Sequence, residues 1–478
     1  MIGREDAPSR SEPTALNLSV RRSESAAPSA TGSLAMLERL WRRFDGSDEL
    51  LRRGGRIVEV SATHYAVHGL SEIARLGDII EHRSHAGARH GEVVRIGREQ
   101  VVVAPFERNS DAGIGDAVFR RGPLTIDPHD SWRGRSIDAL ARAIDNGPPL
   151  LRGDAASAPD ATPGALQRQR VGTAFRTGVR VIDIFTPLCF GQRMGVFAGS
   201  GVGKSTLLAM LAAADAFDTV VVALVGERGR EVREFLEDTI GAAAMAKTVA
   251  VVATSDESAM MRRRAPDTAM RVAEYFRDRG DRVLLVLDSV TRFAHALREV
   301  ATGSGEAPVA RGYPASVFTE LPKLLERAGP GAEGKGSITA IISVLIDGDD
   351  HNDPVADSVR GILDGHVVLD RAIAEQGRYP PVNPLASISR LAAKAWSQEQ
   401  KALVTRLKAM ISRFEDTRDI RLLGAYQGGA DPELDMAVRQ VPLIYEALTQ
   451  TPRDEPSADP FADLARHLKV KQNVDAGD

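Results

Sequence analysis

The sequence predicts an α/β protein whose central part is a mostly parallel sheet with helices on both faces. Between Met194 and Leu369, short and nearly all-apolar segments alternate with helical segments, which is typical of parallel strands and their crossover helices. The first of these strands runs into a glycine-rich segment that precedes a helix, as in a phosphate-binding loop. We therefore expect catalytic groups at the ends of these strands, near that loop.

Composition sets the outer limits on the protein. The chain has 478 residues, of which 43% are apolar and 26% charged, so it can form two or three globular domains. A net charge of −4 gives no electrostatic reason to expect a nucleic-acid partner. The single cysteine, Cys189, excludes an internal disulfide framework and is expected to be a small buried apolar residue. Neither a membrane span nor a secretory signal is visible, so we expect a cytosolic location.

The N-terminal part is predicted to precede the first folded domain. Residues 1–33 are rich in Ser, Ala, Pro and Arg and are expected to be disordered. Within residues 34–54, the segment Leu34–Phe44 carries apolar residues at helical spacing beside several arginines. This amphipathic helix could dock on a partner or on anionic lipid, or it could pack on its own domain.

Residues 55–122 are predicted to form a small antiparallel barrel or sandwich, because short strands follow one another at close spacing. The predicted strands are Arg56–Val60, Tyr65–Val67, Asp78–His82, Glu92–Ile96 and Val101–Ala104. Four histidines occur here, and their spacing fits no standard zinc site, so we expect solvated or capping side chains. They are His64, His68, His82 and His90. An exposed linker is expected at residues 153–168.

The segment Ala198–Thr206 is predicted to be the phosphate-binding loop. Its backbone N–H groups can wrap around phosphate oxygens, because glycines alternate with small residues in Gly199, Ser200, Gly201, Val202 and Gly203. Lys204 would reach the β- and γ-phosphates, Ser205 would ligate Mg²⁺, and Thr206 continues the helix whose N-terminus favours anions. The usual pattern begins with Gly, so Ala198 is acceptable only if its φ is negative. A chance glycine-rich turn is the alternative.

Two acidic residues follow apolar strands. Asp288 comes directly after the strand Val283–Leu287 and could hold Mg²⁺, or it could cap a helix. Glu227 follows the strand Thr219–Val225 and could orient and polarise an attacking water, with Arg228 beside it to orient the carboxylate or to meet phosphate oxygens. A charged first helical turn explains Glu227 equally well, and spacing alone leaves both open. Three more strands are predicted, at Thr248–Ala253, Ile338–Ile346 and Val367–Leu369.

Over about residues 30–450 the chain resembles the export ATPases of bacterial flagella and of the related type III secretion systems, homologues of the catalytic β subunit of rotary ATP synthases. The resemblance rests on several motifs, and Ala198 is usual in this export branch. The motifs are Phe197–Thr206, Val225–Glu231, Leu287–Arg292, Arg311–Phe318, Gly348–Pro354 and Tyr379–Arg390.

The resemblance implies roles for individual residues in binding and hydrolysing ATP with Mg²⁺. Glu227 matches the family's catalytic carboxylate. Arg390 matches the arginine that reaches into the neighbouring subunit's nucleotide site, where it stabilises charge on the γ-phosphoryl group. Tyr379 matches the aromatic residue that packs on adenine, and Tyr426 is a weaker candidate for the other side of the base. Both tyrosines could instead be core residues.

The resemblance also implies an architecture. Residues 55–122 would form the small β-barrel, residues 123–390 a RecA-like P-loop ATPase core, and residues 391–452 a helical C-terminal domain. Helices are expected at Ala392–Met410 and Asp435–Leu448. Residues 453–478 are expected to be a flexible tail, although Phe461–Val470 is weakly amphipathic.

The implied function is a homohexameric ATP hydrolase that energises protein export by the flagellar type III apparatus. Hydrolysis at subunit interfaces would drive the unloading of substrates and chaperones. The implied partners are a negative regulator, stalk proteins, export chaperones and substrates, with peripheral contact to the cytoplasmic membrane face and no nucleic acid. The segment Val181–Arg390 favours the flagellar branch. The alternatives are a virulence type III ATPase, a rotary ion-translocating ATPase, a noncatalytic regulatory subunit and, least supported, an RNA-translocating hexamer.

Overall fold

The computed structural model describes residues 54–84, 87–108, 111–153, 164, 166–346 and 353–475, with side chains to Lys469. The predictions for residues 1–33, for the helix Leu34–Phe44, and for most of the linker at 153–168 lie outside the described residues, as do residues 348–352 of one motif. None of the described helices is long and apolar enough to cross a membrane.

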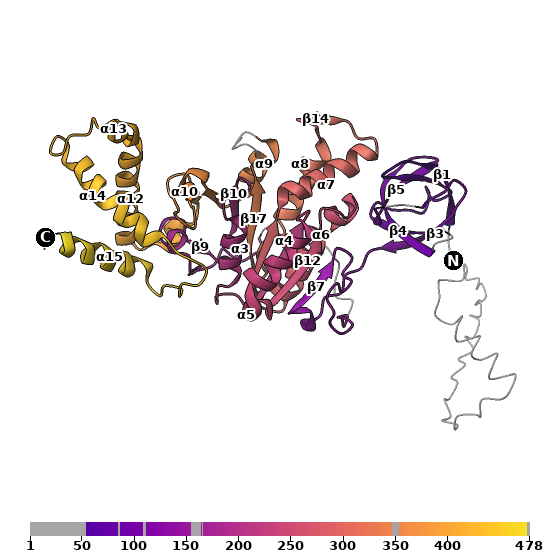
Figure 1. Cartoon of the computed structure of the whole chain (residues 1–478). Coiled ribbons are helices and arrows are strands. Elements are labelled where there is room, and N and C mark those ends of the chain that lie inside the picture. The colour runs from indigo at the N-terminus through magenta and orange to yellow at the C-terminus, as the bar shows by residue number, and fades with distance from the viewer. Residues whose placement is uncertain are drawn as a thin grey trace, which may run out of the picture. The chain divides into compact units, whose positions relative to one another are not determined.

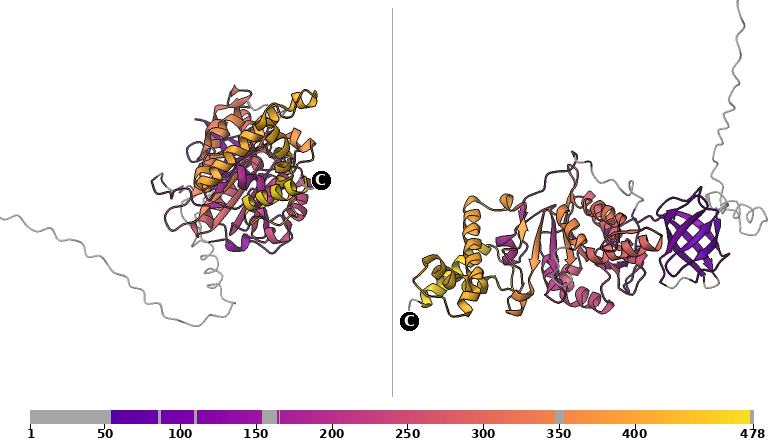
Figure 2. Two further views of the ribbon diagram at one scale, coloured as in Figure 1. Left: turned by 90° about the vertical axis from the view of Figure 1, so that its left-hand side faces the viewer. Right: turned by 90° about the horizontal axis from the view of Figure 1, so that it is seen from above.

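The first described domain is a closed antiparallel barrel of six strands in the order β1-β2-β5-β4-β3-β6, drawn in indigo in Figure 2. Its interior is filled by β-branched and aromatic side chains such as Ile57, Val67 and Val101. A closed barrel leaves no free edge strand, which protects the sheet against edge-to-edge pairing. The prediction of a small barrel is therefore confirmed. The strands are β1 (Gly54–Val60), β2 (Tyr65–His68), β3 (Asp78–Ser84), β4 (Gly87–Ile96), β5 (Gln100–Pro105) and β6 (Ala117–Pro123).

The expectation that the barrel histidines are solvated or capping was wrong for two of them. His64 and His82 are buried, and His82 Nε2 lies 2.8 Å from Asp116 Oδ2. His68 is exposed and bonds the carbonyl oxygen of Glu99 through Nδ1. Barrel closure brings His82 beside Tyr65 in the interior. His64 lies in the turn before β2 and packs against Gly303, so a single-strand pattern reveals neither contact. Within the described ranges, no cluster of three or more His, Cys, Asp or Glu side chains could hold a metal.

The central sheet has the strand order β19-β18-β10-β17-β13-β11-β12-β7, and β16 pairs with β17 (Figure 1). The pairs among β18, β10, β17, β13, β11, β12 and β7 are parallel, whereas β16 and β19 pair antiparallel with their neighbours. The expected parallel sheet is thus confirmed. The strands are β7 (Arg135–Asp138), β10 (Arg193–Ala198), β11 (Thr219–Val225), β12 (Thr248–Ala253), β13 (Arg282–Asp288), β16 (Gly329–Pro330), β17 (Ser337–Leu345), β18 (Gly365–Leu369) and β19 (Ile388–Ser389).

Both faces of this sheet are buried, which explains why its central strands are nearly all apolar. In β11 all seven residues are buried, and alternate side chains join different core clusters. Val221 belongs to the cluster that contains the helices between Ala259 and Ile362, and Val222 belongs to the cluster that contains α2 (Arg180–Phe185), α3 (Lys204–Ala212) and the C-terminal helices. Alternation between two cores follows from the two-residue period of a strand.

The helices of the core lie on both sides of the sheet (Figure 1). Cys189 is buried in β9 (Leu188–Cys189), which pairs antiparallel with β8 (Ala174–Phe175), as expected from its apolar neighbours. The helices are α2 (Arg180–Phe185), α3 (Lys204–Ala212), α4 (Gly229–Glu234), the π-helix Phe235–Thr239, α5 (Gly241–Met245), α6 (Ala259–Asp278), α7 (Val290–Gly303), α8 (Ala315–Leu325), α9 (Pro354–Ile362) and α10 (Arg371–Glu375). The short strands are β8 (Ala174–Phe175), β9 (Leu188–Cys189), β14 (Pro308–Ala310) and β15 (Tyr313–Pro314), and a 3-10 helix spans Asp130–Trp132.

The C-terminal region is helical, but two expectations about it need correction. The single helix expected at Ala392–Met410 is two helices, because Ser397 and Gln400 form a capping box that starts a new helix. The expected flexible tail contains α15, whose Leu464 is buried in the same core cluster as the neighbouring helices. The helices are α11 (Ala392–Ala395), α12 (Gln398–Asp416), α13 (Arg418–Leu422), α14 (Pro432–Leu448) and α15 (Pro460–Asp475).

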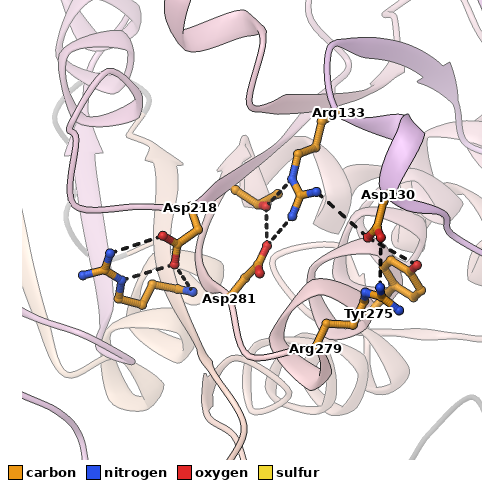
Figure 3. A network of polar contacts seen from close by, with 8 residues as sticks. Asp130, Arg133, Asp218, Tyr275, Arg279 and Asp281 are labelled. Carbon is orange, nitrogen blue, oxygen red and sulfur yellow. Dashed lines mark hydrogen bonds and ion pairs between the residues drawn. The ribbon is translucent and has the colours of Figure 1, made fainter.

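A polar network ties the amino-terminal ends of β11 and β13 to the segment that precedes β7 (Figure 3). The Arg133 guanidinium lies 2.5 Å from Asp281 Oδ2 and donates to Thr219 Oγ1 at 2.8 Å. The Thr219 hydroxyl donates to the same Asp281 oxygen at 2.6 Å, and Thr219 is fully buried. The network therefore gives the buried Thr219 hydroxyl hydrogen-bond partners at the amino-terminal ends of the strands, opposite the carboxyl ends where the phosphate loop lies.

We expect Arg133→Met to lower the free energy of unfolding by about 1–3 kcal/mol, because it leaves Asp281 and Thr219 without their shared donor. Arg233→Met is the matched control, since Arg233 pairs with Glu237 on the surface of α4 and both side chains are mostly exposed. Its cost is expected to stay below about 0.5 kcal/mol. Urea unfolding followed by circular dichroism measures both, and equal losses would contradict a special role of the network.

Candidate active site

The phosphate-binding loop joins β10 to α3 as predicted. Gly201 and Gly203 have φ values of 77° and 91°, a conformation that only glycine adopts without cost. Among the described residues, Ala141 and Arg311 are the non-glycine residues with positive φ, so Ala198 meets the condition set for an alanine there. Helix α3 begins at Lys204, and its first-turn N–H groups have no partner within the helix. The loop and helix end together suit an anionic phosphate group.

Lys204, Asp288 and Glu227 come together at the carboxyl edge of the sheet. Lys204 Nζ lies 2.5 Å from Asp288 Oδ1 and 3.6 Å from Glu227 Oε1. Strand register explains the meeting, because Leu224 of β11 is paired with Asp288 of β13, and Glu227 follows β11 by two residues. Both acidic side chains are largely buried, at 4% and 13% exposure. One cation between two buried carboxylates is the electrostatic centre of the site.

Glu227 has the properties of a proton acceptor. Burial raises the pKa of its carboxyl, and the nearby Asp288 charge acts in the same direction, while Lys204 and Arg292 oppose the shift. Its Oε1 makes no hydrogen bond within the described residues. A buried carboxylate with a raised pKa can take up the proton of a water molecule that is held against it.

Arg292 is a site residue that sequence reasoning missed. Its Nε lies 3.5 Å from Glu227 Oε1, and its NH1 donates to the carbonyl oxygen of Gly226 at 2.7 Å. Helix α7 presents it, since Ser289 caps that helix by accepting from the Arg292 backbone N–H. The sequence feature that could have identified Arg292 is its position four residues after Asp288, in the first turn of the next helix. Arg292 therefore fixes the backbone that carries Glu227.

Arg228 is oriented differently from Glu227. Its side chain is 65% exposed and its ion pair is with Glu231, at 3.5 Å across the first turn of α4.

Ser205 and Thr206 are exposed in the first turn of α3. The Ser205 hydroxyl and the Asp288 carboxylate offer oxygen atoms, the ligand type that Mg²⁺ takes together with phosphate oxygens. The donor set at this edge therefore fits a magnesium ion bound with a nucleotide.

The segment after β18 lies against the phosphate loop from the other side. Arg371 at the start of α10 donates from NH2 to the carbonyl oxygen of Ser200 at 3.2 Å. The Tyr379 ring lies beside Gly203. If Gly203 carried a Cβ atom, that atom would be in van der Waals contact with Tyr379 Cε1, at 3.7 Å. Tyr379 is 47% exposed, so a face of the ring is accessible beside the loop. Arg371 was missed by sequence reasoning, because only the fold brings α10 to the loop.

Tyr426 lies in the C-terminal region, and its hydroxyl donates to Asp435 Oδ1 at 2.5 Å. The aromatic residue that shares a small hollow with Tyr379 is Tyr445 of α14. Tyr445 carries the Arg378 guanidinium 3.7 Å from its ring centre and donates to Glu415 at 2.5 Å. Among the described residues, the structure therefore pairs Tyr379 with Tyr445 in that hollow.

Arg390 lies at the opposite edge of the sheet from the phosphate loop of its own chain. It follows β19, which pairs with the beginning of β18 through Gly365 and Ser389. The phosphate loop starts at the other end, where Ala198 is in register with Leu369 of β18. Four residues of strand separate these levels, about 13 Å at the usual rise. Arg390 is exposed at this amino end of the strands, whereas Lys204 and Glu227 lie at the carboxyl end.

Two family models match this chain. The nucleotide-binding domain of the ATP synthase alpha/beta family matches residues 178–389, and the C-terminal domain of the type III secretion ATPase EscN matches residues 396–468. The flagellum-specific ATP synthase of Rhizobium meliloti is 62% identical over 94% of this chain and 96% of its own length. The chain belongs to the family of flagellum-specific ATP synthases and type III secretion ATPases.

Other members of this export-ATPase family cover most of the chain as well. The type 3 secretion system ATPase of Xanthomonas euvesicatoria is 40% identical over 85% of the chain and 92% of its own length. The assembled ATPase EscN of enteropathogenic E. coli superposes with a TM-score of 0.79 at 39% identity, covering 87% of this chain and all of that one. EscN in complex with its central stalk EscO gives a TM-score of 0.76 at 38% identity, over 87% and 99% of the two chains.

Membership in this family makes the chain an ATP-binding, ATP-hydrolysing enzyme of protein export. The matched nucleotide-binding domain contains Lys204, Glu227 and Asp288, the three side chains that meet at the sheet edge. The match to the EscN C-terminal domain extends into α15, in line with the ordered helix found there.

Proposed function

We propose that the chain works as a homohexameric ATPase of the flagellar type III export apparatus, with each nucleotide site completed by the neighbouring protomer. The position of Arg390 carries this proposal. A guanidinium at the amino edge of the sheet lies too far along the strands to serve its own phosphate loop. A head-to-tail ring brings the edge of one protomer to the site of the next, and such an interface can close into a ring of identical copies. Six copies are what the family resemblance implies.

Within each site the residues take distinct roles. The backbone from Gly199 to Gly203 and the N-terminus of α3 cradle the phosphates, and Lys204 contacts the β- and γ-phosphates. Ser205 and Asp288 would hold Mg²⁺, which would supply positive charge to the phosphate oxygens. Glu227 orients the attacking water and accepts its proton, since its pKa is raised by burial.

The remaining candidate residues act around this centre. Arg390 of the neighbouring protomer stabilises the charge that develops on the transferred phosphoryl group. Tyr379 stacks on the adenine through its exposed face, with Tyr426 as the weaker candidate for the other side of the base. Arg228 contacts phosphate oxygens after a change of rotamer, since its guanidinium is exposed on α4.

The proposed partners follow from the family. We place a stalk protein at the ring, as EscN has its central stalk EscO, together with a negative regulator, export chaperones and export substrates. Hydrolysis at the interfaces would unload substrates from chaperones. The chain would reside in the cytoplasm and contact the cytoplasmic face of the membrane peripherally, and it would not use nucleic acid. The flagellar assignment is favoured over a virulence system by the 62% identity to the Rhizobium meliloti relative, against 40% for the type 3 secretion relative.

A concentration series tests this proposal. We expect specific ATPase activity to rise cooperatively with protein concentration, in step with the appearance of a hexamer in sizing experiments, because a monomer lacks the arginine of a neighbour. Glu237→Gln serves as a control, since Glu237 is 60% exposed and pairs with Arg233 on the surface. Activity that is constant per protomer while the chain is monomeric would contradict the shared site.

A further inference from the structure

Gln450 links the loop of Tyr379 to the ATPase core and to the C-terminal helices. It follows α14 by two residues and is 3% exposed. Its backbone N–H donates to the carbonyl oxygen of Tyr379 at 2.7 Å. This hydrogen bond holds the backbone of the very residue whose ring lies beside Gly203 of the phosphate loop.

The side chain of Gln450 fixes its own position against α2. Its Oε1 accepts from the backbone N–H of Arg180 at 3.0 Å, and its Nε2 donates to the carbonyl oxygen of Gly178 at 2.7 Å. Both amide atoms are therefore used by backbone groups that no other side chain reaches in the described structure. A buried amide with matched partners is costly to replace, because the groups left behind lose their hydrogen bonds.

Arg180 also contacts the end of α14, through its side chain. Its NH1 donates to the carbonyl oxygens of Ala447 and Thr449 at the end of α14. Free carbonyls at a helix C-terminus attract cations, so this guanidinium holds the end of α14 in place. The end of α14, the start of α2 and the Tyr379 loop thus share one set of hydrogen bonds centred on Gln450.

We propose that Gln450 is a positioning residue for the nucleotide base. It acts through Tyr379 and touches neither phosphate nor metal. Because its anchor is shared with the end of α14, a displacement of the C-terminal helices changes the position of the Tyr379 ring and hence the affinity for the base. The inference rests on the proposed role of Tyr379, and it concerns base binding, not the chemistry of hydrolysis.

Binding of Mg·ADP and of Mg·pyrophosphate to the full chain, measured by calorimetry, separates base contacts from phosphate contacts. Gln450→Met removes both amide hydrogen bonds at similar side-chain size. We expect it to weaken Mg·ADP by about 3- to 10-fold, the range of a partly lost aromatic contact, with Mg·pyrophosphate unchanged. If Gln450 has only a structural role, the variant weakens the binding of both ligands alike or of neither, and either result would overturn the proposal.

Two further variants complete the design. Gln192→Met is the matched control, because Gln192 is also fully buried and its amide bridges Cys189 N, Asp364 O and Ser389 Oγ away from Tyr379. It is expected to leave the ratio of the two affinities unchanged. Gln450→Asn keeps the amide but shortens the side chain by one methylene, which stretches both hydrogen bonds. It gives a smaller selective loss and carries the test if the methionine variant does not fold.

Tyr379→Ala separates failure of this inference from failure of the proposed site. If Tyr379→Ala weakens Mg·ADP selectively and the Gln450 variants do not, Tyr379 binds the base but Gln450 does not position it. If Tyr379→Ala leaves both affinities unchanged, the base contact itself is wrong, and the role of Gln450 falls with it. Selective losses in both sets of variants support the proposal.

Discussion

Glu227→Gln is expected to lower kcat by about 10²–10⁴-fold while ATP still binds. The amide keeps the size of the side chain and can still face Lys204, but it cannot accept a proton from water. Because burial already raises the pKa of the Glu227 carboxyl, activity of the wild type should fall on the acid side at a higher pH than for an ordinary glutamate. Steady-state kinetics and equilibrium nucleotide binding measure the two quantities separately.

The control for this variant is Glu237→Gln, ten residues along the chain. Glu237 is 60% exposed and pairs with Arg233, away from the group around Lys204. It is expected to keep turnover near that of the wild type. If Glu227→Gln hydrolyses ATP at the wild-type rate, the carboxylate is a structural partner of Lys204, and another group must orient the water.

Arg390→Ala is expected to lower kcat by about 10³–10⁵-fold, the range for an arginine that stabilises a phosphoryl transition state, with little change in KM. Removing a charge that meets the phosphoryl group only as charge develops affects turnover more than ground-state binding. Arg390→Lys should recover little, because a lysine lacks the planar fork of donors. Arg406→Ala on the exposed side of α12 is the control.

A further property of Arg390→Ala follows from its position at the amino edge of the sheet. The variant should remain a hexamer and bind nucleotide with its own intact loop, since Lys204 and the loop backbone lie about 13 Å away along the strands. Loss of nucleotide binding together with loss of turnover would point to a folding defect and not to a catalytic arginine.

Much of the site was visible in the sequence because local features carry it. The strand ends at Ala198, Val225 and Asp288 are marked by apolar runs that stop at glycine or a charge, and a parallel sheet brings such ends to one edge. The proximity of Lys204 to Glu227 and Asp288 follows from that rule and from strand register.

The residues that were missed depend on contacts between distant segments. Arg371 meets Ser200 across 171 positions, and Gln450 meets Gly178 across 272, so no local pattern announces either contact. The burial of His82 follows from closure of the barrel, and that of His64 from its contact with Gly303, which is far away in the sequence. The break before α12 was readable, since Ser397 and Gln400 have the spacing of a capping box.

The most direct test of a site shared between protomers is to mix the Glu227→Gln and Arg390→Ala variants. Each alone is expected to be inactive. In a mixed ring, an Arg390→Ala protomer can stand next to a Glu227→Gln protomer. The first then contributes an intact Glu227 and the second an intact Arg390, so the site between them is complete. With random assembly of equal amounts, about one interface in four is complete, and activity should recover toward that fraction of the wild type. If the mixture exchanges subunits, as labelled protomers would reveal, and still shows no turnover, Arg390 does not act across the interface, and the account of the shared site is wrong.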